Sequence, residues 1–323
     1  MKKLLILGSE GYLGTVLVPF LSKNNYEIVG VDQCFFGKKN KNSKKIKIIK
    51  KNYSDLKKDF LEKFDYVIDL INISNDPASE LNRKFTYRVN YLNKLNLYKK
   101  LSKSKNLKKY VYMSSCSVYG NNKNLITEKS TPKPISLYSK LCLKYEKYLK
   151  LKKKIPFSIL RLGTLYGWSK RMRYDVAINK IIRDMIFLKK VEVLGGNQLR
   201  FFCYNKFACK IIDSIIKDST NRYKNKILNI GVFNTNIIKL IDKILKIIKI
   251  NNINVVHEKN TIDKRSYEVS LKTVKKMFLN LNLNNLVKNS IYATYLKIKN
   301  DKKPFDRKKI TLNIYKDYLN LKK

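Results

Sequence analysis

The stretch LLILGSEGYLG, from Leu4 to Gly14, joins an apolar run to three regularly spaced glycines. The apolar run predicts a buried strand, and Gly8, Gly11 and Gly14 follow it at the spacing G-x-x-G-x-x-G, where a helix begins. Glycine lets the turn be tight and lets its backbone approach a pyrophosphate, whose charge is favourable at a helix N-terminus. The strand–turn–helix pattern therefore predicts a dinucleotide-binding site.

An acidic residue stands where the second strand is predicted to end. Asp32 directly follows the apolar run Glu27–Val31. A carboxylate at this place accepts hydrogen bonds from the ribose hydroxyls of an adenosine, and its charge repels a 2′-phosphate. The sequence therefore favours NAD over NADP as the cofactor. The alternative is an ordinary glycine turn beside a surface aspartate.

Short apolar runs alternate with helical patterns along the chain, as in a series of βαβ units. Because these runs are strongly apolar and well separated, they predict an α/β fold, a doubly wound parallel sheet with helices on both faces. The last twenty or so residues, rich in Lys and Asn, could fray. The predicted strands are Lys3–Leu7, Glu27–Val31, Ile46–Ile49, Tyr66–Leu70, Tyr110–Ser114, Phe157–Leu162 and Ile227–Gly231. The predicted helices are Tyr12–Lys23, Ala78–Ser102, Leu137–Leu151, Lys206–Lys217 and Ile237–Ile250.

The chain is strongly basic, with 70 Lys and Arg against 24 Asp and Glu and a formal net charge of +46 over 323 residues. Only ten of the basic residues are Arg, and the lysines are spread over the whole chain beside abundant Asn, Ile and Tyr. A/T-rich codons specify these residues, so we attribute the excess to mutational bias and expect no nucleic-acid partner. The charge still favours an anionic small substrate.

The composition excludes several other classes of protein. A hydrophobic fraction of 44% is enough for a large buried core, so disordered and fibrous classes are ruled out. No run is apolar for long enough to form a transmembrane helix or a secretory signal, and we expect a cytoplasmic protein without a membrane partner. Five cysteines without a C-x-x-C pair and a single histidine, His257, predict neither a disulfide framework nor a metal site.

Several further motifs occur in an order typical of one known family. They are Gly8–Gly14, Asp32, Asn90, Ser114–Gly120, Tyr138, Leu160–Leu162 with Tyr166–Gly167, Arg200 and Arg265–Tyr267. On these motifs, the chain from Met1 to about Phe278 resembles the NAD-dependent epimerase/dehydratase branch of the extended short-chain dehydrogenase/reductases. The resemblance implies a Rossmann domain for NAD at residues 1–168, with 204–235 returning to it. It also implies a smaller lobe, mainly 169–323, that binds a nucleoside-diphosphate sugar.

The resemblance implies a role for each matching residue, and the alternative for each is an ordinary structural role. Tyr138 would be the catalytic tyrosine that removes a proton from a sugar hydroxyl, and Ser115 would hydrogen-bond the same oxygen. Asn179, Arg200 and Arg265 would hold the nucleotide diphosphate, a task suited to arginine because the guanidinium binds phosphate oxygens as a fork. The implied cofactor contacts are Gly8, Gly11, Tyr12, Leu13, Gly14, Asp32, Asn52 at the adenine, Leu70 as a wall, Asn90 beneath the nicotinamide half, and Tyr138.

One position departs from the family pattern Y-x-x-x-K. Cys142 stands four residues after Tyr138, where the family has lysine, and Lys140 points to another side of the helix. In the family this lysine lowers the tyrosine pKa, and without it Tyr138 would move toward its reference pKa of about 10. If the family site brings the tyrosine pKa near 7, a return to about 10 leaves on the order of a thousandfold less phenolate at neutral pH. A protein that binds NAD and a nucleotide sugar with weak or no catalysis is therefore kept as an alternative, and a polyanion binder as a less favoured one.

The type of reaction is narrowed by the residues after Ser115. Dehydratases of the family have an Asp-Glu pair there, whereas this chain has Cys116 and Ser117, which cannot do the same acid–base work. The remaining reactions are epimerisation, or a related oxidation or reduction, through a transient 4-keto sugar. We expect the product to be used in polysaccharide synthesis. The family commonly forms dimers through two helices per subunit, which implies a homodimer built on residues 78–102 and 137–151.

Overall fold

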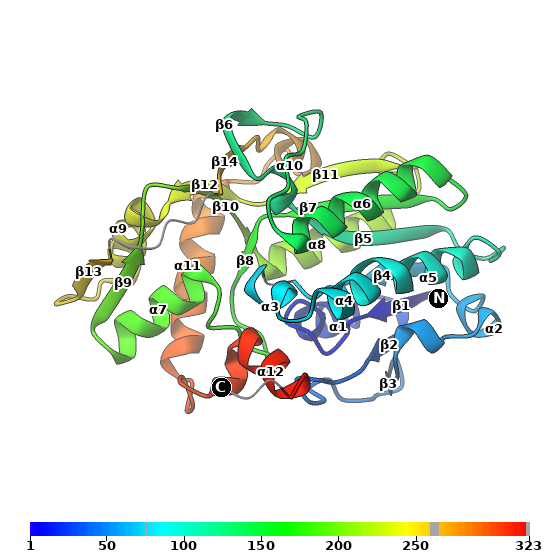
Figure 1. The fold of residues 1–323 in the computed structure, drawn as a ribbon, viewed down its shortest axis with the longest axis horizontal. Helices are drawn as coiled ribbons and strands as arrows, with labels where there is room; N and C mark the ends of the chain where they lie inside the picture. Colours follow the sequence, from blue (N-terminus) through cyan, green and yellow to red (C-terminus); the bar gives the residue numbers. More distant parts are fainter. Residues whose placement is uncertain (75, 259–264, 321–323) are drawn as a thin grey trace.

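A seven-stranded parallel sheet forms the centre of the protein (Figure 1). The computed structural model describes residues 1–74, 76–258 and 265–320. Every predicted strand is found within one or two residues of its expected bounds, so the predicted fold class is confirmed. Across the sheet the strands are β11 (Lys226–Ile230), β7 (Phe157–Leu162), β5 (Lys109–Ser115), β4 (Tyr66–Asp69), β1 (Lys2–Leu7), β2 (Tyr26–Asp32) and β3 (Ile46–Lys50).

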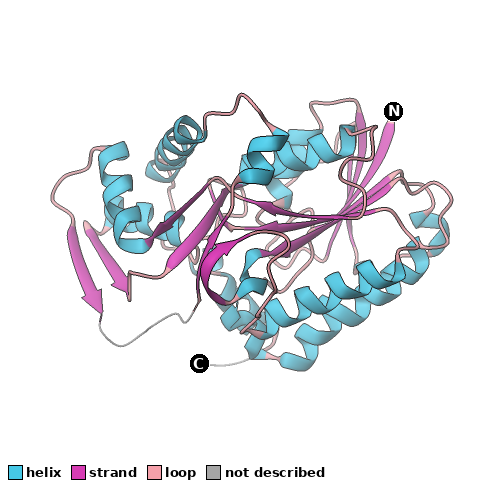
Figure 2. Ribbon diagram, turned by 90° about the horizontal axis from the view of Figure 1, so that it is seen from above, coloured by secondary structure: helices cyan, strands magenta, loops and turns pink. Residues whose placement is uncertain are grey.

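Helices cover both faces of this sheet, as the view in Figure 2 shows. Successive residues of β1 enter opposite cores, because side chains alternate along a strand. Leu4 packs with the helices of one face and Leu5 with those of the other. The first face carries α1 (Gly14–Leu21) and α8 (Asn205–Lys217), and the second carries α2 (Lys58–Leu61), α5 (Asn93–Leu101) and α6 (Leu137–Lys152).

The helix predicted over residues 78–102 is instead a series of short segments. Asn82 has an extended backbone, and its side chain accepts a hydrogen bond from the Phe85 N–H at 2.9 Å, so that a new helix begins after it. Residues 88–92 then form one turn of π-helix before α5 begins. The prediction of one continuous helix was wrong because a side-chain cap competes with the helical backbone at Asn82. The segments are α3 (Asp76–Leu81), α4 (Arg83–Tyr87) and the π-turn η2 (Arg88–Leu92).

Among the described residues, three smaller sheets and four helices build the second lobe, which lies at the other end of the molecule from the N-terminus in Figure 1. The predicted helix at 237–250 is found there, whereas most of its strands were not predicted. The strands are β6 (Asn121–Ile126), β8 (Thr164–Tyr166), β9 (Lys190–Leu194), β10 (Leu199–Tyr204), β12 (Phe233–Asn236), β13 (Asn254–Glu258) and β14 (Ser266–Val269). The helices are α7 (Ala177–Phe187), α9 (Ile237–Ile248), α10 (Lys272–Met277) and α11 (Leu283–Lys299).

The chain crosses between the two lobes more than once. It leaves the central sheet after β7 and returns at β11, which pairs with β7 in parallel. Helix α8 precedes that return and shares its core with α1. The boundary placed at residue 168 stays a prediction.

The described end of the chain forms helix α12 (Thr311–Tyr318), so the expectation that the last twenty or so residues could fray was wrong for residues 311–318. Tyr315 is only 6% exposed and packs edge-on against the rings of Phe35 and Phe36. The Tyr318 ring also lies 4.3 Å from Phe35. The helix holds its place because these aromatic side chains leave water against the loop after β2. Residues 321–323 lie outside the described residues.

Two structural features are absent from the described residues. Within 1–74, 76–258 and 265–320, no helix is both long and apolar enough to cross a membrane. In the same residues, no group of three His, Cys, Asp or Glu side chains is placed to hold a metal ion.

Candidate active site

A cavity of about 650 Å³ opens at the carboxyl ends of the central strands. Its wall includes the glycine turn after β1, Leu70 after β4, Ser115 at the end of β5 and Leu162 at the end of β7. The second lobe contributes Arg200 and Tyr267. Ligands of parallel α/β sheets bind at this edge, where strand ends and helix N-termini meet.

The glycine turn is shaped so that side chains cannot replace Gly8 or Gly14. Gly8 has a φ of +84°, a conformation that L side chains rarely adopt. A Cβ on Gly14 would lie 2.3 Å from the Gly8 carbonyl oxygen, so helix α1 can start there only with glycine. Gly8, Gly11 and Gly14 all line the cavity. This bare backbone beside a helix N-terminus suits the pyrophosphate of a dinucleotide such as NAD.

Two buried side chains join the glycine turn to the loop after β8. The Tyr12 hydroxyl donates to the Gly167 carbonyl at 2.5 Å, and the Asn179 amide donates to that hydroxyl at 2.9 Å. The Asn179 carbonyl oxygen accepts from the Gly167 N–H at 3.0 Å. Tyr12 and Leu13 line the cavity, whereas Asn179 is fully buried behind its wall. A direct role of Asn179 toward a diphosphate stays a prediction.

Asp32 holds the glycine turn against the loop that follows β2. One carboxylate oxygen accepts from the Glu10 N–H at 3.0 Å and the other from the Cys34 N–H at 2.7 Å. Burial raises the pKa of Asp32, and the nearby Glu10 carboxylate raises it further. Glu10 is itself fully buried and accepts from the Asn40 side chain at 2.9 Å. The predicted contact of Asp32 with a ribose stays a prediction, and two acidic groups here disfavour a 2′-phosphate.

Tyr138 and Ser115 meet on the cavity wall. Tyr138 lies in the first turn of α6, which begins where the Ser136 hydroxyl accepts from the Ser139 N–H at 3.2 Å. Burial raises the pKa of Tyr138 well above its usual value, and the Cys142 thiol and the Asp76 carboxylate raise it further. A hydrogen bond with Ser115 acts in the opposite direction. The two predicted catalytic residues are therefore neighbours, and the surroundings of Tyr138 favour the neutral phenol over the phenolate.

Cys142 is fully buried beside Tyr138, and burial raises the pKa of its thiol to about 12. This thiol is the polar neighbour of the Tyr112 hydroxyl, which makes no well-formed hydrogen bond among the described residues. A buried cation, Lys94, lies 5.0 Å from the Tyr112 ring. Its ammonium pairs with the equally buried Asp69 carboxylate at 2.6 Å, so its charge is largely neutralised there.

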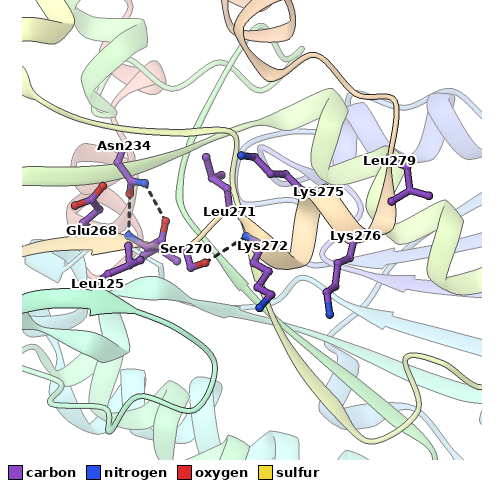
Figure 3. A pocket seen from close by; sticks show the side chains of 10 residues that line it. Leu125, Asn234, Glu268, Ser270, Leu271, Lys272, Lys275, Lys276 and Leu279 are labelled. Carbon is purple, nitrogen blue, oxygen red and sulfur yellow. Dashed lines mark hydrogen bonds between the residues drawn. The ribbon is translucent and has the colours of Figure 1, made fainter.

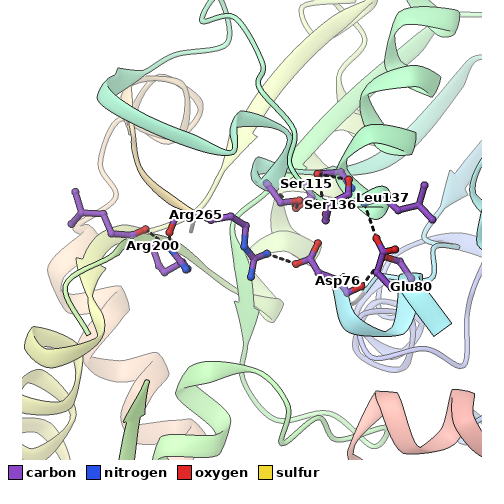
Figure 4. Close-up of polar contacts among 11 residues, drawn as sticks. Asp76, Glu80, Ser115, Ser136, Leu137, Arg200 and Arg265 are labelled. Carbon is purple, nitrogen blue, oxygen red and sulfur yellow. Dashed lines mark hydrogen bonds and ion pairs between the residues drawn. The ribbon is translucent and has the colours of Figure 1, made fainter. Parts of the chain in front are cut away.

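The two arginines predicted to hold a diphosphate lie close together on the second lobe, as Figure 4 shows. Arg200 comes from β10, and its guanidinium donates to the carbonyl oxygens of Leu199 and Arg265. Arg265 points toward the first lobe and pairs with Asp76 at the start of α3. A ligand that recruits Arg265 must therefore compete with Asp76. The role of both arginines stays a prediction.

Asn52 and Asn90 do not line the cavity, and the structure gives each of them another contact. Asn52 caps a short 3₁₀ turn by accepting from the Ser54 N–H at 3.2 Å. Asn90, on the π-turn η2, accepts from the Ile73 N–H at 2.9 Å and donates to the Ile73 carbonyl at 3.3 Å. It thus fixes the loop that begins with Leu70 and forms part of the wall. Direct contacts of Asn52 and Asn90 with a cofactor stay predictions.

Several wall residues were missed by sequence reasoning. Arg171 and Arg173 follow the Tyr166–Gly167 motif, and two arginines so close to it were a signal that could have been used. Arg173 pairs with Asp175 at 2.8 Å, which holds the pKa of that carboxyl well below its usual range. Further wall residues come from elements without any motif: Phe36, Asp76, Thr311 and Tyr315.

A second hollow, of about 610 Å³, lies on the surface of the second lobe (Figure 3). It is lined by Leu125 and Leu279, which are 57% and 87% exposed, and by lysines of α10. None of the site residues predicted from the sequence lines it.

Fold and site together define an α/β enzyme built to bind a dinucleotide at the carboxyl edge of its parallel sheet. The model of the NAD-dependent epimerase/dehydratase family matches residues 4–231, more than two thirds of the chain. The chain belongs to this family. The predictions of NAD as cofactor and of an enzyme of the extended short-chain dehydrogenase/reductase type are thereby confirmed.

Relatives and solved structures agree with this placement. YtcB of Bacillus subtilis, described as an uncharacterised UDP-glucose epimerase, is 27% identical over 66% of this chain and 72% of its own. A putative UDP-glucose 4-epimerase of Methanocaldococcus jannaschii is 27% identical over 71% of this chain and 76% of its own. The UDP-N-acetylglucosamine 4-epimerase of Methanobrevibacter ruminantium has the same fold, with a TM-score of 0.79 at 22% identity over 91% of this chain and 97% of that one. The UDP-glucuronic acid 4-epimerase of Bacillus cereus gives 0.77 at 22% identity over 92% and 99%.

Proposed function

We propose that this protein is a nucleotide-sugar 4-epimerase that acts through a transient 4-keto sugar. One observation carries the proposal: Tyr138 and Ser115 line the same cavity as the glycine turn, and Arg200 and Arg265 line it from the second lobe. Two relatives bear the name UDP-glucose epimerase, so UDP-hexoses are the first substrates to test.

Each residue has a separate task in this proposal. Tyr138 takes the proton of the sugar 4-hydroxyl and later returns it, while Ser115 holds the same oxygen. NAD held at the glycine turn would supply the acceptor for a hydride of the sugar and then the donor that returns it. Arg200 and Arg265 bind the diphosphate as forks, which leaves the sugar itself able to present its other face between the two steps. The ion pair between Arg265 and Asp76 breaks when the diphosphate binds.

The residues after Ser115 favour epimerisation over dehydration. The Cys116 thiol is fully buried and donates to the Arg161 carbonyl at 3.1 Å. Burial raises the pKa of that thiol well above its usual value, so it does not serve as a base at neutral pH. The Ser117 hydroxyl lines the cavity but bonds to Ser115 at 2.8 Å. Neither side chain supplies the acid–base pair that elimination of water needs.

A second function is kept because of Cys142. With the pKa of Tyr138 raised by burial and no lysine four residues on, little phenolate forms at neutral pH. Such a protein binds NAD and a nucleotide sugar with little or no turnover. The charge of bound nicotinamide acts in the opposite direction, so turnover itself decides between the two functions.

The deciding experiment is proton NMR of the purified protein with NAD and a panel of UDP-, GDP- and dTDP-sugars. We expect a new sugar stereoisomer, and we expect Tyr138→Phe to form it at least about 100-fold more slowly, the usual contribution of a general base. Tyr148→Phe, near the other end of the same helix, is the matched control and should retain activity. A keto or deoxy product would contradict epimerisation and show that the protein catalyses oxidation or dehydration instead. No product, with NAD demonstrably bound, would favour the binding function.

We further propose a cytoplasmic homodimer that serves polysaccharide synthesis. The helices implied for the dimer carry an exposed Leu92, 41% accessible, and a neighbouring surface where the Lys144 ammonium lies over the rings of Tyr87 and Tyr91. Light scattering of the purified protein and of Leu92→Glu tests the dimer. A mass of one chain for the unaltered protein would contradict it.

A further inference from the structure

Arg171 is a buried cation with two donors that lack a partner. Its side chain lines the cavity and is only 4% exposed. One terminal nitrogen donates to the Thr311 hydroxyl at 3.0 Å. The Nε and the other terminal nitrogen have no hydrogen-bond partner among the described residues. Buried guanidinium donors are costly to leave unmatched, so this pair of donors calls for an acceptor from outside the protein.

The carboxylates around Arg171 are engaged elsewhere. Asp175 binds the Arg173 guanidinium through both of its oxygens, at 3.0 and 2.8 Å. Asp32 accepts from the N–H groups of two loop residues at its two oxygens. Burial, together with the charge of Arg173, lowers the pKa of Arg171 to about 10, so the guanidinium remains charged at neutral pH. The group is therefore a desolvated cation that an incoming anion would stabilise.

The backbone of Arg171 is tied to the glycine turn. The hydroxyls of Thr15 and Ser169 lie 2.6 Å apart, and the Ser169 hydroxyl also donates to the Tyr12 carbonyl at 2.9 Å. The Arg171 N–H donates to the same Ser169 hydroxyl at 3.2 Å. Two separate segments of the chain, Gly8–Gly14 and the loop after β8, are thus fastened together. An anion bound to the unpartnered donors of Arg171 would therefore lie in the part of the cavity next to the glycine turn, which we call the cofactor half.

The surrounding wall also belongs to the cofactor half. The Arg171 guanidinium lies 3.7 Å from the ring centre of Phe36, which follows Asp32 in the chain. Tyr315 packs on Phe36 from helix α12. The charge of Arg171 also acts on Asp32, the residue predicted to meet the adenosine ribose.

We propose that Arg171 is a ligand of the dinucleotide pyrophosphate, which it binds from the side opposite the glycine turn, with helix α12 as the wall that orients it. The Nε and Nη1 donors point in different directions in one plane, so each can meet a separate oxygen of the pyrophosphate, and the Nη2 bond to Thr311 fixes that plane. This inference concerns the cofactor and does not depend on the reaction proposed for the sugar.

The test is calorimetric binding of NAD, ADP-ribose and adenosine to Arg171→Gln, in the absence of any sugar nucleotide. We expect NAD and ADP-ribose to bind about 10- to 100-fold more weakly, the loss of charge-assisted hydrogen bonds, and adenosine, measured by competition, to change less than about twofold. Arg171→Lys keeps the charge but loses the fixed planar set of donors, and we expect an intermediate loss. Arg222→Gln removes the same charge from an exposed position and should change none of the three affinities.

Thermal unfolding provides a second readout. Removing a buried unmatched cation should leave the melting temperature of the ligand-free protein unchanged or raised, while the rise caused by NAD becomes smaller. Unchanged affinity for NAD and ADP-ribose would overturn the proposal. An equal loss for adenosine, or a lower melting temperature of the ligand-free Arg171→Gln protein, would assign Arg171 a structural role instead. A separate titration with UDP-glucose completes the test: weaker binding of UDP-glucose with unchanged affinity for NAD would overturn the proposal and assign Arg171 to the nucleotide-sugar site.

Discussion

At the scale of single residues, the proposed chemistry depends on how Tyr138 is charged. Burial raises the pKa of Tyr138, and the nearby Cys142 thiol and Asp76 carboxylate raise that pKa further. Lys94 on α5 is a buried cation like the lysine that the family pattern has at position 142, but it is paired with Asp69 on β4. A phenolate at Tyr138 is therefore disfavoured, and a positive charge at position 142 would favour it.

We predict that Cys142→Lys moves the pH dependence of turnover toward lower pH. Phenolate is the active form, so a lower pKa of Tyr138 brings the rising part of the kcat/KM profile closer to neutral pH and raises activity there about tenfold or more. The longer side chain overfills a fully buried position and should lower the free energy of unfolding by about 1–3 kcal/mol. Rates measured from pH 6 to 10 and urea unfolding check both effects.

Cys142→Ser is the control for this change, because serine is close to cysteine in size and carries no charge. It should leave the pH profile where it is. An identical profile for the Cys142→Lys protein, once correctly folded, would show that Tyr138 does not need a cation from this position.

At the scale of elements, the π-turn η2 determines one wall of the cavity. Asn90 lies in this turn with its side chain buried, and that side chain makes two hydrogen bonds to the backbone of Ile73. The loop held in this way contains Leu70, Asn72 and Ser74 of the wall. Widened helical turns of this kind are frequent at functional sites.

We predict that Asn90→Ala destabilises this loop. The Ile73 N–H is left buried without its acceptor, which should lower the free energy of unfolding by about 1–3 kcal/mol. NAD should bind several-fold more weakly, because the wall beside it is less well fixed. Asn96→Ala, an exposed asparagine on α5, should change the free energy of unfolding by less than about 0.5 kcal/mol. Urea unfolding and calorimetry measure both, and equal behaviour of the two variants would contradict the prediction.

At the scale of the whole molecule, the net charge of +46 opposes compactness. The buried ion pairs, such as Arg161 with Glu146 at 2.5 Å, are shielded from salt by the surrounding protein. Most lysines, in contrast, stand on the surface and repel one another. Salt should therefore weaken the repulsion more than it weakens the ion pairs.

We predict that raising NaCl from about 20 mM to about 500 mM increases the melting temperature by a few degrees, because the screening length falls well below the spacing of surface charges. Differential scanning calorimetry without ligands measures the effect. A neutral osmolyte at equal osmolality is the control and should reproduce only a small part of it. A lower melting temperature in high salt would mean that surface ion pairs outweigh the repulsion.

Predictions from sequence succeeded where a local pattern determines a local structure. The seven central strands follow from apolar runs, and the glycine turn follows from backbone freedom at Gly8 and Gly14. The same reasoning failed at residues 78–102, where the cap at Asn82 and the π-turn divide the helix. It also failed at the end of the chain, because polar composition concealed the aromatic contacts of α12.

The sequence by itself determined the α/β fold, the dinucleotide turn, the family and the missing lysine at position 142. Only the tertiary structure decided that Asn179 lies behind the cavity wall, that Arg265 is held by Asp76, and that α12 completes the site. The physical reason is distance along the chain. Strand alternation and glycine turns involve neighbours, whereas the bond from Arg171 to Thr311 joins residues 140 positions apart. Such a contact depends on how the lobes pack, and no local pattern encodes it.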